Sequence, residues 1–403
     1  MEIRPILSAM WRNKTGSVLV AMQIALTLAI VVNSMFMAQD RLEHINRPTG
    51  MDVDNIITAQ SMGFGMNYEH DATITRDLEV LRALPGVVAV TSASSLPLSN
   101  SGSGTGYRAS LDEDAPRESA NYYRFGEDAD KALGVKLVAG RMFRDTEILP
   151  GSDPDYNRMP PVVIVTQDYA DRLFPDEPAL GKLIYDGLGD SAEIVGIVEH
   201  MLGAWVSWED LSSVMWMPRR TDGPWTRYII RTEPGKRDEL VPIVEQALIE
   251  ADQTTRLVRN VKTFEDVVAR SYMGDRAIAI TLMTSIALLL LITGLGIVGL
   301  ASFTVRQRTK QIGTRRAVGA RKRDIIRYFL LENWLMTTIG LILGTVLSIG
   351  LNYGLASAFD MERLNYIYLV IGVLSLWVLG VIAVADPARR AAQVSPAIAT
   401  RTV

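Results

Sequence analysis

Four long apolar stretches constrain this chain more than any other feature of its sequence. They cover residues 18–38, 276–305, 334–359 and 366–385, and their interiors contain no Asp, Glu, Lys, Arg or His. Because a helix rises about 1.5 Å per residue, roughly 20 apolar residues cross the hydrocarbon core of a bilayer. The sequence therefore predicts a membrane α-helical bundle of four transmembrane helices, one before and three after a large polar region at residues 39–275.

The first apolar stretch has an alternative interpretation as a cleaved signal peptide. It is longer than the apolar region of most such peptides, and it ends in Met-Phe-Met-Ala-Gln-Asp rather than in a small-x-small cleavage site. An uncleaved membrane anchor is therefore the favoured interpretation.

The charges that flank the four stretches predict their orientation. Segments 1–17, 306–333 and 386–403 are strongly basic, whereas the short loop at 360–365 carries one arginine against two acids. Cytoplasmic loops carry an excess of Lys and Arg. We therefore expect a protein of the inner (plasma) membrane with both termini and segment 306–333 in the cytoplasm, and with residues 39–275 outside.

The composition excludes several functions. The chain has no cysteine and three widely spaced histidines (His44, His70 and His200), so no metal site is expected. It contains no G-x-x-x-x-G-K-[ST] loop, so any ATP with its Mg²⁺ must bind to another chain, and no cofactor is expected on this one. No catalytic constellation is present, which argues against an enzyme. Membrane lipid explains the basic segments, so no nucleic acid is expected as a partner.

Glycines within the apolar stretches predict close helix packing. Gly294, Gly296 and Gly299 match the G-x-G-x-x-G pattern of dinucleotide-binding proteins, but they lie in the middle of a predicted span. That pattern binds a nucleotide only between a strand and a helix. In lipid, small residues let helices approach closely. We expect this packing role for these three glycines and for Gly340 and Gly344.

The polar region predicts an α+β extracytoplasmic domain of two subdomains, with a boundary between residues 110 and 135. The Asn-Ser-Gly-Ser-Gly-Thr-Gly sequence at 100–106 is expected to be a flexible loop. Apolar periodicity and turn residues indicate the other elements. Helices are expected at residues 71–84 and 240–251, a helical stretch around Tyr169 to Phe174, and strands at 162–165, 192–201, 226–232 and in the VVAVTSAS sequence after Gly86.

A cluster of tryptophans and methionines lies between residues 201 and 217. Trp205, Trp208, Met215 and Trp216 either pack into the core on a strand and its loop or form an exposed surface for a partner or an apolar substrate. The sequence leaves both interpretations open.

The basic segment 306–333 combines charges with apolar residues at helical spacing, as in a helix at a membrane surface. By itself such a helix could serve only to fix the topology. The segment also resembles the FtsX/MacB family of ABC transporter permeases (type VII, mechanotransmission), whose motif is close to R-x-R-E-I-G-I-x-R-A-x-G-A-x-x-x-D-I. The matching residues are Arg306, Arg308, Ile312, Gly313, Arg316, Ala317, Gly319, Ala320, Asp324 and Ile325, followed by Glu332.

The resemblance extends over essentially the whole chain. The C-terminal PARRAAQVSPAIATR and the N-terminal RPILSAMWRNKTGSVLV are similar to the ends of these permeases. The stretch PVVIVTQDYADRLFPDEPALGKLI resembles their MacB-type periplasmic domain, more loosely than the basic motif. The resemblance is to members without a fused ATPase domain.

The resemblance implies a permease dimer that binds two cytosolic ATPase subunits and transmits their motion to the outer domain. Substrates of the family are handled outside the membrane, and we expect export or extrusion of a peptide, antibiotic or lipid-like molecule. A periplasmic adaptor and an outer-membrane channel are further expected partners. The alternative is an FtsX-like regulatory protein that controls a periplasmic partner such as a cell-wall hydrolase. The implied ATPase-coupling residues are Arg308, Gln311, Ile312, Gly313, Arg315, Arg316, Ala317, Gly319, Ala320 and Asp324.

This sequence departs from the family motif at three positions. Gln311 replaces the usual Glu, Thr314 replaces an Ile, and Thr400 replaces a Leu in the C-terminal tail. The lost carboxylate removes a charge-assisted contact, typically about 1.5–3 kcal/mol when fully formed. We therefore favour pairing with a second, non-identical permease subunit that retains the acid over a homodimer.

Overall fold

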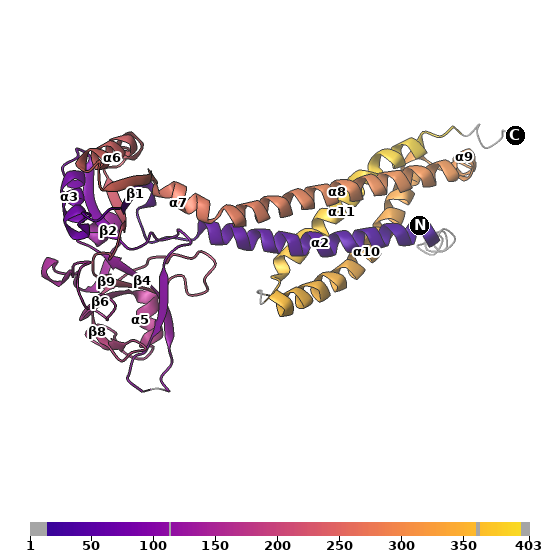
Figure 1. Cartoon of the computed structure of the whole chain (residues 1–403). Coiled ribbons are helices and arrows are strands. Elements are labelled where there is room, and N and C mark those ends of the chain that lie inside the picture. The colour runs from indigo at the N-terminus through magenta and orange to yellow at the C-terminus, as the bar shows by residue number, and fades with distance from the viewer. Residues whose placement is uncertain (1–13, 113, 360–362, 396–403) are drawn as a thin grey trace. The chain divides into compact units, whose positions relative to one another are not determined.

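The computed structural model describes residues 14–112, 114–359 and 363–395 (Figure 1). The predicted contributions of residues 1–13, of the loop at 360–362 and of the tail from 396 lie outside the described residues. The chain divides into a helical unit, formed by Met1–Asn46 with Gly274–Val403, and a globular unit, Arg47–Met273.

Within the described residues, four helices of the helical unit are long and apolar enough to cross a bilayer. One precedes the globular unit and three follow it, so the predicted arrangement of the spans is confirmed. The first helix continues past the predicted span end at residue 38. The helices are α2 (Lys14–Asn46), α8 (Met273–Gln307), α10 (Lys322–Phe359) and α11 (Tyr366–Ala392).

Helices α2, α10 and α11 approach one another closely because glycines remove side chains from their contacts. A Cβ atom on Gly340 would lie 2.8 Å from the carbonyl oxygen of Ala21, and one on Gly344 would lie 2.9 Å from that of Ala25. On α11, a Cβ on Gly372 would lie 2.5 Å from the side chain of Val32. The α2–α10 contact is thus a small-residue packing of the kind that drives helix association in lipid.

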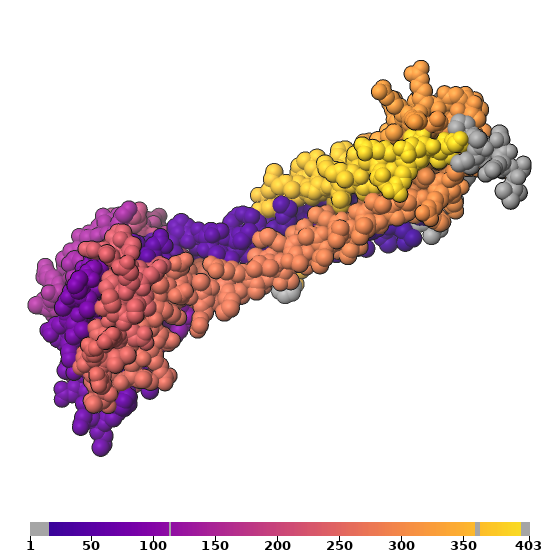
Figure 2. Space-filling view, turned by 90° about the horizontal axis from the view of Figure 1, so that it is seen from above, coloured from indigo at the N-terminus to yellow at the C-terminus, as the bar shows by residue number. Residues whose placement is uncertain are grey.

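Helix α8 packs less closely than its neighbours and runs along the outside of the bundle (Figure 2). A Cβ on Gly296 would lie 2.6 Å from the side chain of Gln23, and Thr27 and Thr293 share a 2.8 Å hydrogen bond. A Cβ on Gly294 would make only an ordinary contact, 3.4 Å from Leu379, and one on Gly299 would meet no described atom within 4 Å. Among the predicted packing glycines of α8, only Gly296 therefore has a tight neighbour within the described part of this chain.

The globular unit is built on one 11-stranded sheet that has two lobes. The strands of the first lobe are β11 (Arg256–Thr263), β1 (Ile56–Gly63), β10 (Trp225–Thr232) and β2 (Val87–Ala93), in that order. The second lobe continues with β4 (Glu118–Phe125), β9 (Val214–Pro218), β6 (Val162–Thr166), β8 (Ser191–Val198) and β5 (Leu137–Gly140), while β3 (Ser103–Tyr107) pairs with β4 and β7 (Leu183–Tyr185) with β8.

The two lobes are joined where β2 pairs with β4 at a single position, Ala93 opposite Phe125. The second lobe is an insertion, because the chain leaves the first lobe after β2 and returns to it with β10. The predicted boundary between residues 110 and 135 is therefore wrong, since β4 of the second lobe lies within that range. No local sequence pattern predicts that the chain returns to the first lobe at β10, because β10 joins a sheet whose first strand lies more than a hundred residues earlier.

The strands contain continuous apolar runs because both of their faces are buried against elements that are distant in the sequence. On β10, Tyr228 and Ile230 face the core beneath α3 (His70–Arg82) and α6 (Arg237–Ala251), whereas Ile229 joins a core shared by both lobes. Successive strand residues point to opposite faces, so a strand buried on both sides reads as a continuous apolar run. On β6, Ile164 joins the same shared core.

The predicted strands and helices of the globular unit are present, with one exception in the loop at 100–106. Residues Ser103–Tyr107 form strand β3 instead of a flexible loop, and Gly104 pairs with Asn121 of β4. The glycines permit this pairing because large side chains cover the strand: a Cβ on Gly104 would lie 2.5 Å from Trp208. The predicted helix around Tyr169 is α5 (Gln167–Leu173), which follows β6.

Hydrogen bonds also fasten the lobes together away from the sheet. The carboxylate of Asp71, at the start of α3, accepts from the backbone amides of Gly151 (2.9 Å) and Ser152 (3.0 Å) of the second lobe. Burial acts to raise the pKa of Asp71, but the hydrogen bonds from Ser152 and Gly151 outweigh it and hold that pKa below its usual value. The ionised carboxylate is thus the form that joins the lobes.

Replacing Gly344 with alanine tests the α2–α10 packing. The added methyl group would overlap α2, and we expect a loss of about 1–3 kcal/mol of stability, which is typical of overpacking. The measurement is the thermal unfolding midpoint of the full chain in detergent. The matched control is Gly350→Ala on the same helix, whose Cβ would meet nothing within 4 Å and which should be neutral or slightly stabilising. Equal effects of the two substitutions would contradict this packing role.

Candidate coupling site

The predicted coupling residues lie on α9 (Thr309–Ala317) and on the turn that leads into α10. Helix α9 ends in a tight turn in which the amide of Ala320 donates to the carbonyl of Arg315 over 3.0 Å. Gly319 lies in this turn with φ of +103°, a backbone conformation that side chains disfavour. The Asp324 carboxylate then accepts from the amide of Arg321 at 3.0 Å and caps the start of α10.

The structure divides the predicted residues into an inner and an outer group. Ile312 and Gly313 are buried, and Arg308, Arg316 and Ala320 are half-buried. The outer group, which consists of Gln311, Arg315, Ala317, Gly319 and Asp324, is exposed. We call the exposed surface of α9 and this turn the elbow.

Val318 is an elbow residue that the sequence-based prediction omitted. Its side chain is 85% exposed although it is apolar. It lies between Ala317 and Gly319 in an otherwise basic segment. An isolated apolar residue next to a turn glycine was the signal that could have identified it. Val318 is a candidate contact residue because this exposed apolar side chain lies among the residues of the family motif.

Arg308 forms an ion pair within the helical unit. Its guanidinium lies 3.0 Å from the Glu332 carboxylate, and the two side chains are 17% and 5% exposed. The pair joins the segment between α8 and α9 to α10. The side chain of Arg308 is therefore already bound within the chain, which differs from the predicted direct contact with an ATPase.

Arg316 makes a second connection between the elbow and the bundle. Its guanidinium donates to the carbonyl oxygen of Ala392, at the end of α11. A cation at a helix C-terminus interacts favourably with the helix dipole and with its unpaired carbonyls. Arg315 instead stacks over the ring of Tyr328, 4.9 Å from its centre. The elbow is therefore tied to α10 and α11 by side chains as well as by the backbone.

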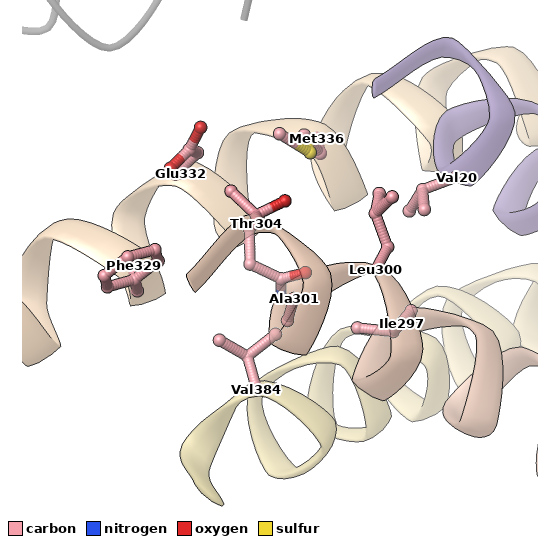
Figure 3. Close-up of a pocket in the computed structure, with 10 residues that line it drawn as sticks. Val20, Ile297, Leu300, Ala301, Thr304, Phe329, Glu332, Met336 and Val384 are labelled. Carbon is pink, nitrogen blue, oxygen red and sulfur yellow. The ribbon is translucent and has the colours of Figure 1, made fainter. Parts of the chain in front are cut away.

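A small cavity lined in part by Glu332 lies where the four long helices meet (Figure 3). Its volume is about 40 Å³, and its lining is mostly apolar apart from Thr304, Glu332 and Asn333. Binding pockets for drug-sized molecules measure about 300–1,000 Å³. This cavity can hold a few water molecules but no substrate of that size.

The structure resolves the two interpretations of the tryptophan and methionine cluster. Met215 and Trp216 on β9 are 0% and 1% exposed, so the interpretation as an exposed partner surface is wrong for them. Trp216 packs edge-on against Phe125 at the junction of the lobes, with ring centres 5.1 Å apart. Trp205 and Trp208 are half-buried and contact each other, with ring centres 5.0 Å apart. They cover Gly104 of β3 rather than forming an open patch.

The fold and this site define a class of protein. A bundle of one plus three apolar helices, a large α/β domain after the first helix and a basic elbow between the second and third spans together describe a membrane permease. The family model of the MacB-like periplasmic core domain matches residues 17–247, and that of the FtsX-like permease C-terminal domain matches residues 283–396. The chain belongs to this FtsX/MacB family of ABC transporter permeases.

Individual relatives agree with this assignment. The uncharacterised ABC transporter permease YknZ of Bacillus subtilis is 25% identical over 419 residues, which cover 99% of this chain and 98% of the relative. The macrolide export ATP-binding/permease protein MacB of Campylobacter jejuni is 27% identical over 335 residues, 79% of this chain and 48% of the relative. The chain spans about half the length of the MacB relatives it matches.

Two solved structures of extracytoplasmic domains are similar to part of this chain. The periplasmic region of MacB from Actinobacillus actinomycetemcomitans gives a TM-score of 0.36 at 17% identity, over 57% of this chain and 98% of that one. The extracellular domain of YknZ gives 0.32 at 16% identity, over 50% and 100%. The matches to transporter permeases do not favour the regulatory alternative.

Substitution of Arg308 tests whether it stabilises the bundle. Arg308→Gln leaves the Glu332 carboxylate without its partner, and we expect a loss of up to about 3 kcal/mol, because unpaired buried charges are costly. The double variant Arg308→Gln/Glu332→Gln should recover part of this loss. The measurement is thermal unfolding of the full chain in detergent.

The control for the ion pair is Arg306→Gln, which removes an equal charge from an exposed side chain two residues away. It should leave the unfolding midpoint nearly unchanged. An Arg306→Gln effect as large as that of Arg308→Gln, or no recovery in the double variant, would contradict the assignment of a stabilising ion pair.

Proposed function

We propose that this chain is the permease subunit of an ATP-driven transporter of the inner (plasma) membrane and has no enzymatic activity of its own. A separate cytosolic ATPase dimer binds ATP with Mg²⁺ and pushes on the elbow. The helical bundle transmits this motion to the globular unit, which exports or extrudes its substrate outside the membrane. The observation that carries the proposal is an exposed, basic elbow that is braced against the bundle.

The side-chain connections of the elbow support the transmission of force. Arg308 connects it to α10 through Glu332, and Arg316 connects it to the end of α11. A movement of the elbow is therefore passed to these helices rather than absorbed by a loose loop. At the other end of the unit, Arg41 of α2 and Asp275 of α8 form an ion pair of 3.2 Å. The chain enters and leaves the globular unit through these two helices, so they are the route by which motion reaches it.

The nature of the spans supports handling of the substrate outside the membrane. Ion-coupled transporters and polar pathways place ionisable groups at membrane depth, and the span interiors of this chain have none. The cavity of about 40 Å³ at the meeting point of the helices is too small for a drug-sized solute. A peptide, an antibiotic such as the macrolides in the name of the MacB relatives, or a lipid-like molecule is the substrate class we propose.

The charge distribution supports the proposed orientation and the contact with membrane lipid. The basic elbow and termini are cytoplasmic under the rule that cytoplasmic loops carry the excess of Lys and Arg, so the globular unit is extracytoplasmic. The basic flanks contact membrane lipid. An adaptor protein and an outer-membrane channel are further proposed partners of the globular unit.

Substitution of Val318 tests the contact with the ATPase. Val318→Asp places a charge at the most exposed apolar position of the elbow, and we expect at least a roughly tenfold loss of ATPase binding, because central apolar contacts dominate interfaces. The measurement is the affinity of the ATPase that co-purifies with the wild-type chain, determined in nanodiscs.

The control for the elbow is Leu188→Asp on the globular unit, because Leu188 is also 85% exposed. This variant should bind the ATPase as the wild type does. The proposal fails if no ATPase co-purifies with the wild-type chain, or if the two substitutions weaken binding equally.

Gln311 bears on the identity of the second permease subunit. It is exposed on the elbow, where the family motif has a glutamate. We propose that this chain pairs with a non-identical permease that retains the acid. When two differently tagged copies of the chain are expressed in its native host, one tag should recover the second permease and almost none of the other tag. Recovery of both tags in the complex in equal amounts would contradict this proposal.

A further inference from the structure

The first lobe of the globular unit contains a surface cavity whose charges are all positive. It lies among β1, β10, β11 and α7 (Phe264–Ser271), and its volume is about 310 Å³. The charged residues of its lining are Arg227 from β10, Lys262 from β11 and Arg270 from α7. We call it the cationic cavity. It takes no part in coupling at the elbow, and its volume is at the lower end of the range for small-ligand pockets.

The three cations have no acid partner among the described residues. No carboxylate lies within 4.0 Å of Arg227, Lys262 or Arg270 in the part of the chain that the structure describes, although most other basic residues of the first lobe form such pairs. The nearby Asp266 is occupied elsewhere, because its carboxylate accepts from Thr263 at 2.8 Å where α7 begins. Within the described residues, no ion pair therefore balances the positive charge of the cavity.

Burial of these cations without an acidic partner costs free energy. Arg227 is half-buried and donates to the carbonyl oxygen of Ser94, and burial lowers the pKa of Arg227. Burial and then the charge of Arg270 lower the pKa of Lys262, and only Asp266 acts in the opposite direction. In both groups the effect of burial is larger than any stabilisation by a nearby acid. Like charges gathered without an acid are expected where a protein receives an anionic ligand.

An irregularity in β11 brings its side chains into the cavity. The register of β11 against β1 shifts between Thr58 and Gln60, and Asn260 has φ of +52°, which is uncommon for a residue other than glycine. The Asn260 amide donates to Gln60 at 2.9 Å, and both residues line the cavity with Lys262. Such bulges redirect side chains at functional sites. The cavity thus combines three cations with neutral donors.

We propose that the cationic cavity binds a phosphate group. Two arginines and a lysine match the recognition of phosphate oxygens, and a group with nearly two negative charges balances three cations better than a carboxylate with one. The neutral amides of Gln60 and Asn260 supply further hydrogen bonds. The phosphate comes from a soluble phosphate monoester or from the headgroup of phosphatidic acid, because both carry a phosphomonoester with nearly two negative charges. This site is separate from the elbow and does not depend on the proposed transport function.

The test uses the full chain in nanodiscs of phosphatidylcholine and titrates inorganic phosphate by calorimetry. Binding should be abolished or weakened at least roughly tenfold in Lys262→Met and in Arg270→Gln, because each removes a charge-assisted hydrogen bond. Lys262→Arg should retain binding. Acetate, which carries one charge, should bind much more weakly than phosphate. Equal binding of acetate and phosphate would overturn the assignment of a phosphate group.

The matched control is Arg259→Gln, an exposed cation of the same strand that does not line the cavity. It should bind phosphate as the wild type does. Thermal unfolding of each variant checks that it is folded. The lipid arm repeats the comparison by measuring phosphatidic acid retained by the protein after exchange into phosphatidylcholine nanodiscs.

The outcomes separate the two sources. Binding of inorganic phosphate that requires Lys262 and Arg270 supports a soluble ligand, and retained phosphatidic acid that requires them supports a lipid headgroup. If neither kind of binding depends on these two residues, or if Arg259→Gln has the same effect, the proposal is overturned.

Discussion

The close approach of α2 to α10 and α11 is the contact on which the helical unit depends. In lipid, apolar side chains gain nothing by leaving the solvent, so helices associate through tight packing and a few polar contacts. Gly340, Gly344 and Gly372 supply the packing, because each leaves room for an atom of α2 where a side chain would stand. The buried amide of Asn33 adds a hydrogen bond to the carbonyl of Ser348 at 3.1 Å. These contacts make α2, α10 and α11 a firm body, to which α8 is attached more loosely.

In the coupling that we propose, the elbow acts on the packed helices α2, α10 and α11. A coupling segment can transmit force only if its own conformation is fixed, and here the turn at Gly319, the cap at Asp324 and the Arg308–Glu332 pair fix it. The residues that hold the elbow in place therefore differ from those that we propose contact the ATPase. Arg308, Glu332 and Asp324 make contacts within the chain, whereas Val318 and Gln311 are exposed on the elbow.

The globular unit is stabilised differently from the helical unit. Its surface is in contact with water, so the burial of apolar area supplies its stability. One sheet runs through both lobes, and Trp216 and Phe125 pack beside the single pairing that joins β2 to β4. Hydrogen bonds away from the sheet, such as those that Asp71 accepts from the second lobe, also connect the two lobes. The lobes are thus one body with a narrow connection, and the cationic cavity lies at the edge of one of them.

The sequence by itself determined the four spans, the position of the large domain, the family and most of the strands and helices. Most of these features can be read from short stretches of sequence. About 20 consecutive apolar residues indicate a membrane span, and apolar residues that recur every two or 3.6 positions indicate a strand or a helix. Only the tertiary structure decided which glycines pack tightly, since Gly296 meets Gln23 whereas Gly299 meets no neighbour within the described chain. It also placed Met215 and Trp216 in the core, moved the lobe boundary, turned Arg308 toward Glu332 and gathered Arg227, Lys262 and Arg270 around one cavity. Each of these depends on residues far apart in the chain, whose proximity no local pattern records.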